Sequence, residues 1–223
     1  MKLTHSEIKY QIEADNSFIN TVVVEDPVIF RNAVNELQKQ CNGISGKFIL
    51  SDSNKEIAIH KKIELILNPF DIDINSKKVL SKVYEKLEAL AVSEDLYTKT
   101  KALEQQIISY LEELDFRFSE PVEFDLDLNI TSLFKAVNVY VESGASLPES
   151  LDRYMRLSND FLGLNWFFFV NLKSYLSPAE LRQLFDSAAY NKYYITLVES
   201  RESDEKCEFE KLYILDKDFC EIW

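Results

Sequence analysis

The sequence contains few of the residues that nucleotide, metal and nucleophile sites usually employ. Its 223 residues include four glycines, three cysteines and two histidines. The two histidines, His5 and His60, leave little room for a histidine-based catalytic triad or a zinc site, and four glycines leave no dinucleotide-binding fingerprint. The cysteines have no metal-ligand spacing, and their odd number argues against a disulfide framework. We therefore expect reduced thiols and a cytoplasmic location.

Long apolar runs and a basic charge balance are also missing. No run approaches the roughly 20 residues of a membrane-spanning helix, and the first residues, MKLTHSEIKY, lack the apolar core of a signal peptide. We expect no membrane partner. The formal net charge of −13 argues against a general nucleic-acid coat protein. It permits local basic patches, because salt screens charges beyond about 8 Å.

The stretch NGISGKFIL at residues 42–50 contains two glycines and a lysine, like a phosphate-binding loop. In a P-loop, G-x-x-x-x-G-K-[ST], the glycines are further apart and a hydroxyl residue follows the lysine. Here Gly43 and Gly46 are three apart and Phe48 follows Lys47. A helical pattern precedes the stretch and a strand pattern follows it, the reverse of a P-loop. We interpret Gly43 as a helix C-cap and Gly46 as a turn residue.

Strand and helix patterns alternate at both ends of the chain. KLTHSE, IKYQIE and INTVVVED predict three short strands, and Pro27 opens a helix that ends near Gln40. Further on, the apolar strand NWFFFVNL is followed by a helix with a capping box at Ser177 and Glu180, and then by the strand KYYITLVES. This βαβ order predicts parallel strands. VYVES predicts another strand, and EKLYILD closes the sheet.

The middle of the chain has a different composition. Residues 73–114 contain no glycine or proline, and two apolar stripes predict an antiparallel helical hairpin with Ser93 as N-cap of its second helix. Exposed leucines on such long helices would favour contact with a partner chain. The sequence therefore predicts an α/β domain, residues 1–70 and 138–223, interrupted by a helical domain at residues 71–137.

An acidic segment follows the hairpin. In SEPVEFDLDLN, carboxylates alternate with apolar residues, so a strand would place three of them on one face. A hard cation would relieve their repulsion, although a solvated acidic face and a two-metal catalytic site are alternatives. The D-x-D-x-N spacing is not an EF-hand, because Ile130 replaces the required glycine. The candidate metal ligands are Glu120, Glu123, Asp125 and Asp127.

Several segments resemble the short-form CRISPR-associated adaptation protein of type II-A systems. They are VNLKSYLSPAELRQLFDSAAYNKYYITLVES with the ending YILDKDFCEIW, SLFKAVNVYVE, and TVVVEDPVIFRNAVNELQ. Length and element order are also similar, so the resemblance covers essentially the whole chain.

The resemblance implies a head domain with a sheet like that of a P-loop ATPase but without a functional P-loop, and an inserted helical leg. It implies a homotetrameric ring that binds double-stranded DNA ends without sequence preference during spacer acquisition. Structural calcium held by leg-region carboxylates, and partnership with the CRISPR integrase and the RNA-guided effector nuclease, are also implied. No catalytic activity is established for the family, so we expect a protein that is not an enzyme.

A ring can bind DNA despite its acidic chains if lysines converge on the bore, because phosphate contacts need only positive charge. Isolated lysines otherwise serve solubility. The run from Trp166 to Phe169 favours core packing over a base-stacking platform. The candidate DNA-binding residues are Lys61, Lys62, Lys135, Lys173 and Lys192.

Two other functions remain open from the sequence. The ATPase-like sheet could act only as a scaffold for protein partners of the adaptation complex. Less favoured is a metal-dependent nuclease, because no histidine and no second acidic motif accompany the acidic segment.

Overall fold

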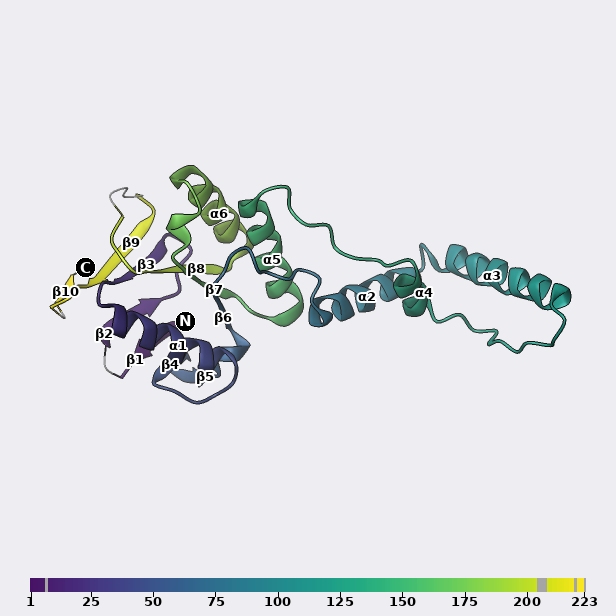
Figure 1. The fold of residues 1–223 in the computed structure, drawn as a ribbon, viewed down its shortest axis with the longest axis horizontal. Coiled ribbons are helices and arrows are strands. Elements are labelled where there is room, and N and C mark those ends of the chain that lie inside the picture. Colours follow the sequence, from purple (N-terminus) through teal and green to yellow (C-terminus); the bar gives the residue numbers. More distant parts are fainter. Residues whose placement is uncertain (7, 204–207, 219, 223) are drawn as a thin grey trace. The chain divides into compact units, whose positions relative to one another are not determined.

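The computed structural model describes residues 1–6, 8–203, 208–218 and 220–222 and shows a mixed α/β protein. The chain forms two compact units (Figure 1). The first comprises Met1–Ile74 and Glu142–Trp223, and the second comprises Asn75–Val141. The inserted unit thus begins and ends a few residues later than the sequence patterns placed it.

A six-stranded sheet forms the centre of the first unit, with the strand order β10-β9-β3-β8-β7-β6. All neighbours pair in parallel except β10, which pairs antiparallel with β9. The predicted parallel pairing across the βαβ unit is therefore confirmed, whereas β9 does not close the sheet. The strand bounds are β3 Ile19–Val24, β6 Ile63–Ile66, β7 Trp166–Val170, β8 Tyr194–Glu199, β9 Glu210–Leu215 and β10 Glu221–Ile222.

Helices α5 (Leu147–Leu162) and α6 (Pro178–Asn191) cover one face of this sheet (Figure 1). The predicted capping box of α6 is present, with the Ser177 hydroxyl accepting from the Glu180 amide and the Glu180 carboxylate accepting from the Ser177 amide. Helix α5 ends at Gly163, whose φ of 72° suits a residue without a Cβ. Phe167 and Phe169 of β7 point into this core.

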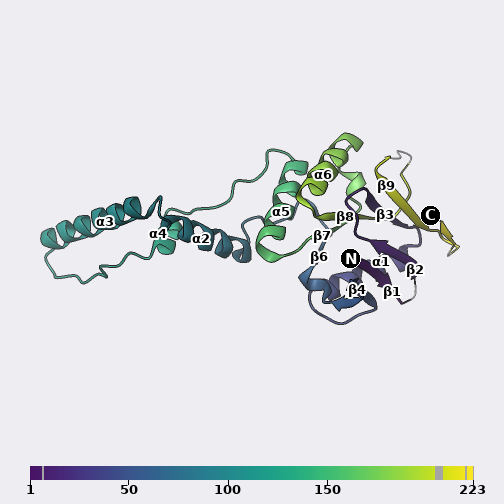
Figure 2. The ribbon, with the colours of Figure 1, turned by 180° about the vertical axis from the view of Figure 1, so that it is seen from behind.

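The opposite face packs against helix α1 (Pro27–Cys41) and a four-stranded antiparallel sheet, which Figure 2 shows from behind. Trp166 and Phe168 of β7 contribute to this second core, with Leu3, Leu37 and Leu50. All of β7 is buried, as expected for an apolar strand covered on both sides. The smaller sheet has the order β2-β1-β4-β5, with β1 Lys2–His5, β2 Ile8–Glu13, β4 Phe48–Asp52 and β5 Lys55–Ile57.

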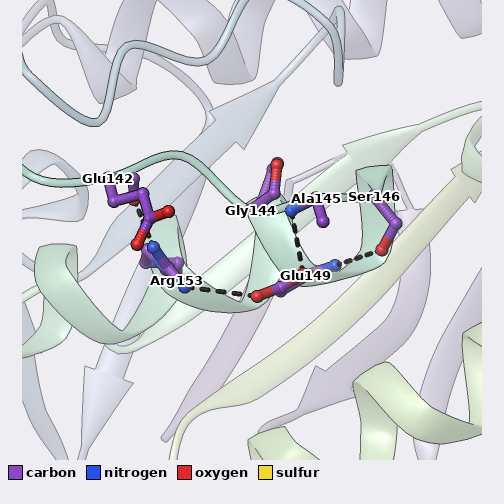
Figure 3. A network of polar contacts seen from close by, with 7 residues as sticks. Glu142, Gly144, Ala145, Ser146, Glu149 and Arg153 are labelled. Atoms are coloured by element: carbon purple, nitrogen blue, oxygen red, sulfur yellow. Dashed lines mark hydrogen bonds and ion pairs between the residues drawn. The ribbon is translucent and has the colours of Figure 1, made fainter.

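A polar network fixes the chain where it returns to the first unit (Figure 3). The Arg153 guanidinium donates to the Glu142 carbonyl and pairs with Glu149 at 3.2 Å. The other Glu149 oxygen accepts from the Ala145 amide at 2.8 Å. Gly144 lies so close to this turn that a Cβ there would approach the Ser150 nitrogen to 2.5 Å. The return segment is thereby held against the start of α5.

The second unit contains α2 (Lys77–Ala91), α3 (Tyr97–Arg117) and α4 (Ile130–Ala136). Helix α2 packs on α4, with the Tyr84 and Phe134 ring centroids 6.1 Å apart. Within this unit α3 continues beyond α2 in both views, so the predicted antiparallel hairpin is wrong (Figures 1 and 2). Within the part of the chain that the structure describes, every residue of α3 is at least partly exposed.

Two local predictions for this region are also wrong. Ser93 is not an N-cap, because its hydroxyl donates to the Leu90 carbonyl and α3 begins only at Tyr97. VYVES forms no strand, because its backbone groups form hydrogen bonds with side chains and not with a neighbouring strand. The Tyr84 hydroxyl donates to the Val139 carbonyl, and the Asn75 side chain donates to the Val141 carbonyl and accepts from the Val141 amide. None of the described helices has the length and hydropathy needed to cross a bilayer.

Candidate nucleic-acid interface

The turn between β3 and α1 is where a parallel sheet would offer a helix N-terminus to a phosphate. Here the Asp26 carboxylate accepts from the amides of Val28 and Ile29, both at 2.9 Å. Pro27 at the first helical position has no N–H to offer. Two donors are therefore occupied, a third is missing, and a negative charge stands at the helix end, which disfavours an anionic ligand.

The glycine-lysine stretch at 42–47 instead joins α1 to β4, as predicted. Gly43 has a φ of 83° just beyond the helix end. The Gln40 side chain donates to the Phe48 carbonyl at 2.8 Å and accepts from the Phe48 amide at 2.9 Å. A Cβ on Gly46 would come within 2.6 Å of that side chain. The loop therefore has a structural role, because the Gln40 side chain joins α1 to β4.

The four candidate metal ligands lie in an irregular segment. Residues 118–129 form no helix or strand, so the predicted acidic strand face does not exist. Glu120, Glu123, Asp125 and Asp127 are all exposed. Among the described residues, no three His, Cys, Asp or Glu side chains lie close enough together to hold a metal ion. The segment lacks the hydrogen-bonded neighbour strand that would have imposed alternation.

Three of the candidate DNA-binding lysines lie at one edge of the large sheet. Lys61 belongs to the short 3-10 helix η1 (Ile59–Lys61) and Lys62 follows it, directly before β6. Lys192 is the C-cap of α6 and lies two residues before β8. Because β6, β7 and β8 are parallel neighbours, all three residues lie at the amino ends of these strands.

The local structure at this edge is well defined. The Lys62 carbonyl accepts from the amides of Asn165 and Trp166, both at 3.0 Å, and the Asn165 carbonyl accepts from the Tyr194 amide at 2.9 Å. The Lys62 ammonium approaches the Gly163 carbonyl at 3.4 Å. Lys61 and Lys192 are exposed, and Lys192 has a φ of 60°. Backbone hydrogen bonds between neighbouring segments therefore fix the part of the chain that carries these lysines.

Lys173 lies at the opposite edge, in η2 (Leu172–Ser174) just after β7. Its ammonium is 2.6 Å from Glu210. Its amide donates to the Glu199 carboxylate at 3.1 Å. Burial raises the pKa of Glu199 to about 7. Lys173 is therefore committed to an internal ion pair, which the isolated lysine in the sequence did not reveal.

Lys135 belongs to the second unit, in the last turn of α4, and is exposed. The aromatic run Trp166 to Phe169 is fully buried, which confirms its role in the core. The Trp166 indole donates to Thr196 at 2.9 Å. Cys41 and Cys220 are free thiols, and Cys207 lies outside the described residues.

Sequence reasoning missed the polar group around Lys173. Thr21, Glu199 and Glu210 come from three strands that only the topology brings together. The Thr21 hydroxyl and one Glu210 oxygen are buried without a hydrogen-bond partner among the described residues. Their only sequence signal is a polar residue at an inward position of an apolar strand.

Comparison with known proteins gives one family and several similar structures. The model of the family described as CRISPR-associated protein (Cas_Csn2) matches residues 40–219. The structure resembles the crystal structure of Stu0660 of Streptococcus thermophilus with a TM-score of 0.55 and 13% identity, over 96% of this chain and 74% of that chain. At that identity, the likeness concerns the fold alone.

Weaker likenesses link the chain to ATP-binding proteins of ABC transporters. A putative one from Pyrococcus furiosus has a TM-score of 0.39 and 10% identity, over 95% of this chain and 93% of that chain. The ATP-binding cassette MJ1267, in its ADP conformation, has a TM-score of 0.44 and 11% identity, over 92% and 79%. Such low scores carry no argument about function. No curated protein sequence matches. The family match covers most of the chain, and the chain therefore belongs to the Cas_Csn2 family of CRISPR-associated proteins, in agreement with the resemblance found in its sequence.

Proposed function

We propose that this protein binds double-stranded DNA ends without reading their sequence and without catalysing a reaction, as a homotetrameric ring. Its family supports a role in CRISPR adaptation, the acquisition of new spacers. The observation that carries the DNA proposal is the placement of Lys61, Lys62 and Lys192 at the amino ends of three adjacent parallel strands.

The charges at the two edges of the sheet favour this assignment. Glu25 and Asp26 follow β3, Glu199 ends β8 and Asp216 follows β9, so the carboxyl ends of these strands are acidic. A DNA backbone would avoid that edge and approach the amines. Contacts between ammonium groups and phosphate oxygens carry no base information, so binding would be independent of sequence. Lys135 is a separate candidate on the second unit, whereas the ion-paired Lys173 is left out.

The absence of catalysis is proposed from the same geometry. The Asp26-capped start of α1 is unsuited to a nucleotide phosphate. A metal-dependent nuclease would need convergent carboxylates, and the described residues bring no three metal-binding side chains together. Both observations favour a binding protein over an ATPase or a nuclease.

Assembly into a ring is supported by the surface of α3. Apolar side chains remain exposed along this helix and beyond it, and a patch of this kind favours a partner chain. They are Leu96, Tyr97, Leu103, Tyr110, Leu114, Phe116 and Phe118. The same surface favours the alternative of a scaffold for protein partners, among which the CRISPR integrase and the RNA-guided effector nuclease are proposed.

We propose that calcium binds only to the assembled ring. Within one chain the four candidate carboxylates do not form a cage. They are exposed, and they form no ion pair within 4 Å in the part of the chain that the structure describes, although Asp127 lies near enough to Lys101 to contribute to the raised pKa of that lysine. Hard cations prefer such oxygen ligands.

The test compares affinity for a linear duplex and for a covalently closed circle of the same sequence. Threading onto ends predicts binding to the linear form alone. Lys61→Glu or Lys192→Glu, each made singly, should weaken binding and reduce the salt slope by about one unit for the lost contact. Lys217→Glu, an exposed lysine after β9 at the acidic edge, is the matched control and should leave affinity nearly unchanged. Equal affinity for both DNA forms, or an equal effect of Lys217→Glu, would contradict the proposal.

A further inference from the structure

Asn165 occupies the centre of the proposed DNA-binding edge. Its amide donates to the Lys62 carbonyl at 3.0 Å, and its own carbonyl accepts from the Tyr194 amide at 2.9 Å. The residue thus lies directly before β7, between β6 and β8, and neighbouring strands of a sheet are about 4.8 Å apart. Lys62 precedes β6 on one side, and Lys192 lies two residues before β8 on the other. Backbone hydrogen bonds therefore hold an asparagine between two lysines.

The side-chain amide of Asn165 has an unused acceptor. Its Oδ1 atom is buried and accepts no hydrogen bond from the residues that the structure describes. The residue as a whole is partly exposed, so with the oxygen inside, the NH2 group is the polar end left for a ligand at the edge. A buried acceptor without a donor costs free energy. The stability of the fold therefore does not explain why an asparagine stands here.

The charges around this amide are mostly positive. Three amines lie along the edge, from Lys61, Lys62 and Lys192. The nearest acid in the chain, Asp160 in the last turn of α5, follows Arg156 by one helical turn. Helices α5 and α6 both end at this edge, and a helix C-terminus disfavours an anion. The Lys62 ammonium, 3.4 Å from the Gly163 carbonyl, and Lys192 at the C-cap of α6 offset these two ends, which leaves an anion as the favoured ligand.

We propose that Asn165 is a further DNA-binding residue, whose NH2 group donates a hydrogen bond to a phosphate oxygen between Lys62 and Lys192. The inference rests on the proposed function and deepens it, because it adds a neutral contact to an edge of charged ones. Asparagine and lysine side chains both bind phosphate oxygens in protein–DNA complexes. A hydrogen bond requires alignment of donor and acceptor, so Asn165 fixes the position of a phosphate that the lysines attract.

The experiment measures the affinity of the full chain for a fluorescent linear duplex over a range of salt concentrations. Asn165→Ala should weaken binding about two- to ten-fold for each lost contact, with the salt slope nearly unchanged, because a neutral contact releases no counterion. Asn165→Asp should weaken it further and lower the slope by about one unit, because the carboxylate offsets one amine. Asn32→Asp adds the same charge at an exposed position of α1 and should have little effect on either quantity.

Urea denaturation separates a binding role of Asn165 from a structural one. Because Asn165→Ala removes a buried acceptor that has no donor, the free energy of unfolding should stay equal or rise. Native DNA affinity in Asn165→Ala would overturn the proposal, and so would a loss of stability that accompanies weaker binding. If Lys61→Glu and Lys192→Glu weaken binding and Asn165→Ala does not, only this inference fails. If the native protein binds no DNA, the proposed function fails as well.

Discussion

The ammonium group of Lys173 lies 2.6 Å from a carboxylate oxygen of Glu210, with the two side chains 15% and 5% exposed. The pair joins η2, at the end of β7, to the start of β9, two elements that are not neighbours in the sheet. Glu199 accepts from the Lys173 amide beside it. One lysine thus serves two acids near the acidic edge of the sheet.

Replacement of Lys173 by methionine should lower the free energy of unfolding by about 3–5 kcal/mol, because it leaves a buried carboxylate uncompensated. The double variant Lys173→Met with Glu210→Gln should regain much of that loss. Chemical denaturation of all three proteins measures both effects. Lys61→Met, an exposed control, should change stability little and DNA affinity more. If Lys173→Met is as mild as the control, the ion pair does not stabilise the sheet.

Stability should also depend on pH through Glu199. Its pKa of about 7 in the folded protein lies above the ordinary glutamate value, because burial disfavours the charged form. Such a group contributes stability below pH 4.5 that is lost as the pH rises through 7, by up to about 3 kcal/mol. Glu199→Gln should therefore be more stable than the native protein at pH 8 and similar at pH 5. Urea denaturation at the two pH values tests this, and an equal difference at both would contradict it.

The two glycines that flank α5 allow a matched comparison of backbone effects. In Gly144→Ala the new Cβ would meet the backbone of Glu149 and Ser150, which cannot move without disturbing the Arg153 network. In Gly163→Ala the Cβ meets nothing within 4 Å, and only the left-handed backbone conformation is strained, at about 1–2 kcal/mol. We expect Gly144→Ala to lower the melting temperature further than Gly163→Ala. The reverse order would show that the return segment can shift.

Local signals in the sequence predicted much of the first unit. The apolar run of β7 and the Ser177–Glu180 capping box each fix a conformation through neighbours in the chain, so their interpretation needed no tertiary knowledge. The parallel order of β7 and β8 followed from the helix between them. The antiparallel strand β10 carries too few residues for any pattern.

The second unit and the site were harder to predict because their contacts are long-range. Apolar periodicity showed that α2 and α3 are helices, but not that α2 packs on α4, which lies some 40 residues further along. Alternating acids suggested a strand at 123–127, yet alternation has no effect without a neighbouring strand. Lys173 could not be distinguished from Lys61 by sequence, because a buried partner 37 residues away decides its role.

Calcium should change the mass of the protein in solution if the four exposed carboxylates become ligands on assembly. We expect a tetramer with calcium, and smaller species with a chelator, because the repulsion among these acids is then uncompensated. Joint replacement of Glu120 and Glu123 by Gln and of Asp125 and Asp127 by Asn should make the mass insensitive to calcium. A control variant neutralises Glu94 and Asp95, two exposed acids just before α3, and should leave the response intact. Light scattering in the two buffers gives the answer. A monomer in both would contradict the ring, whereas a tetramer in both would retain the ring and exclude calcium from its assembly.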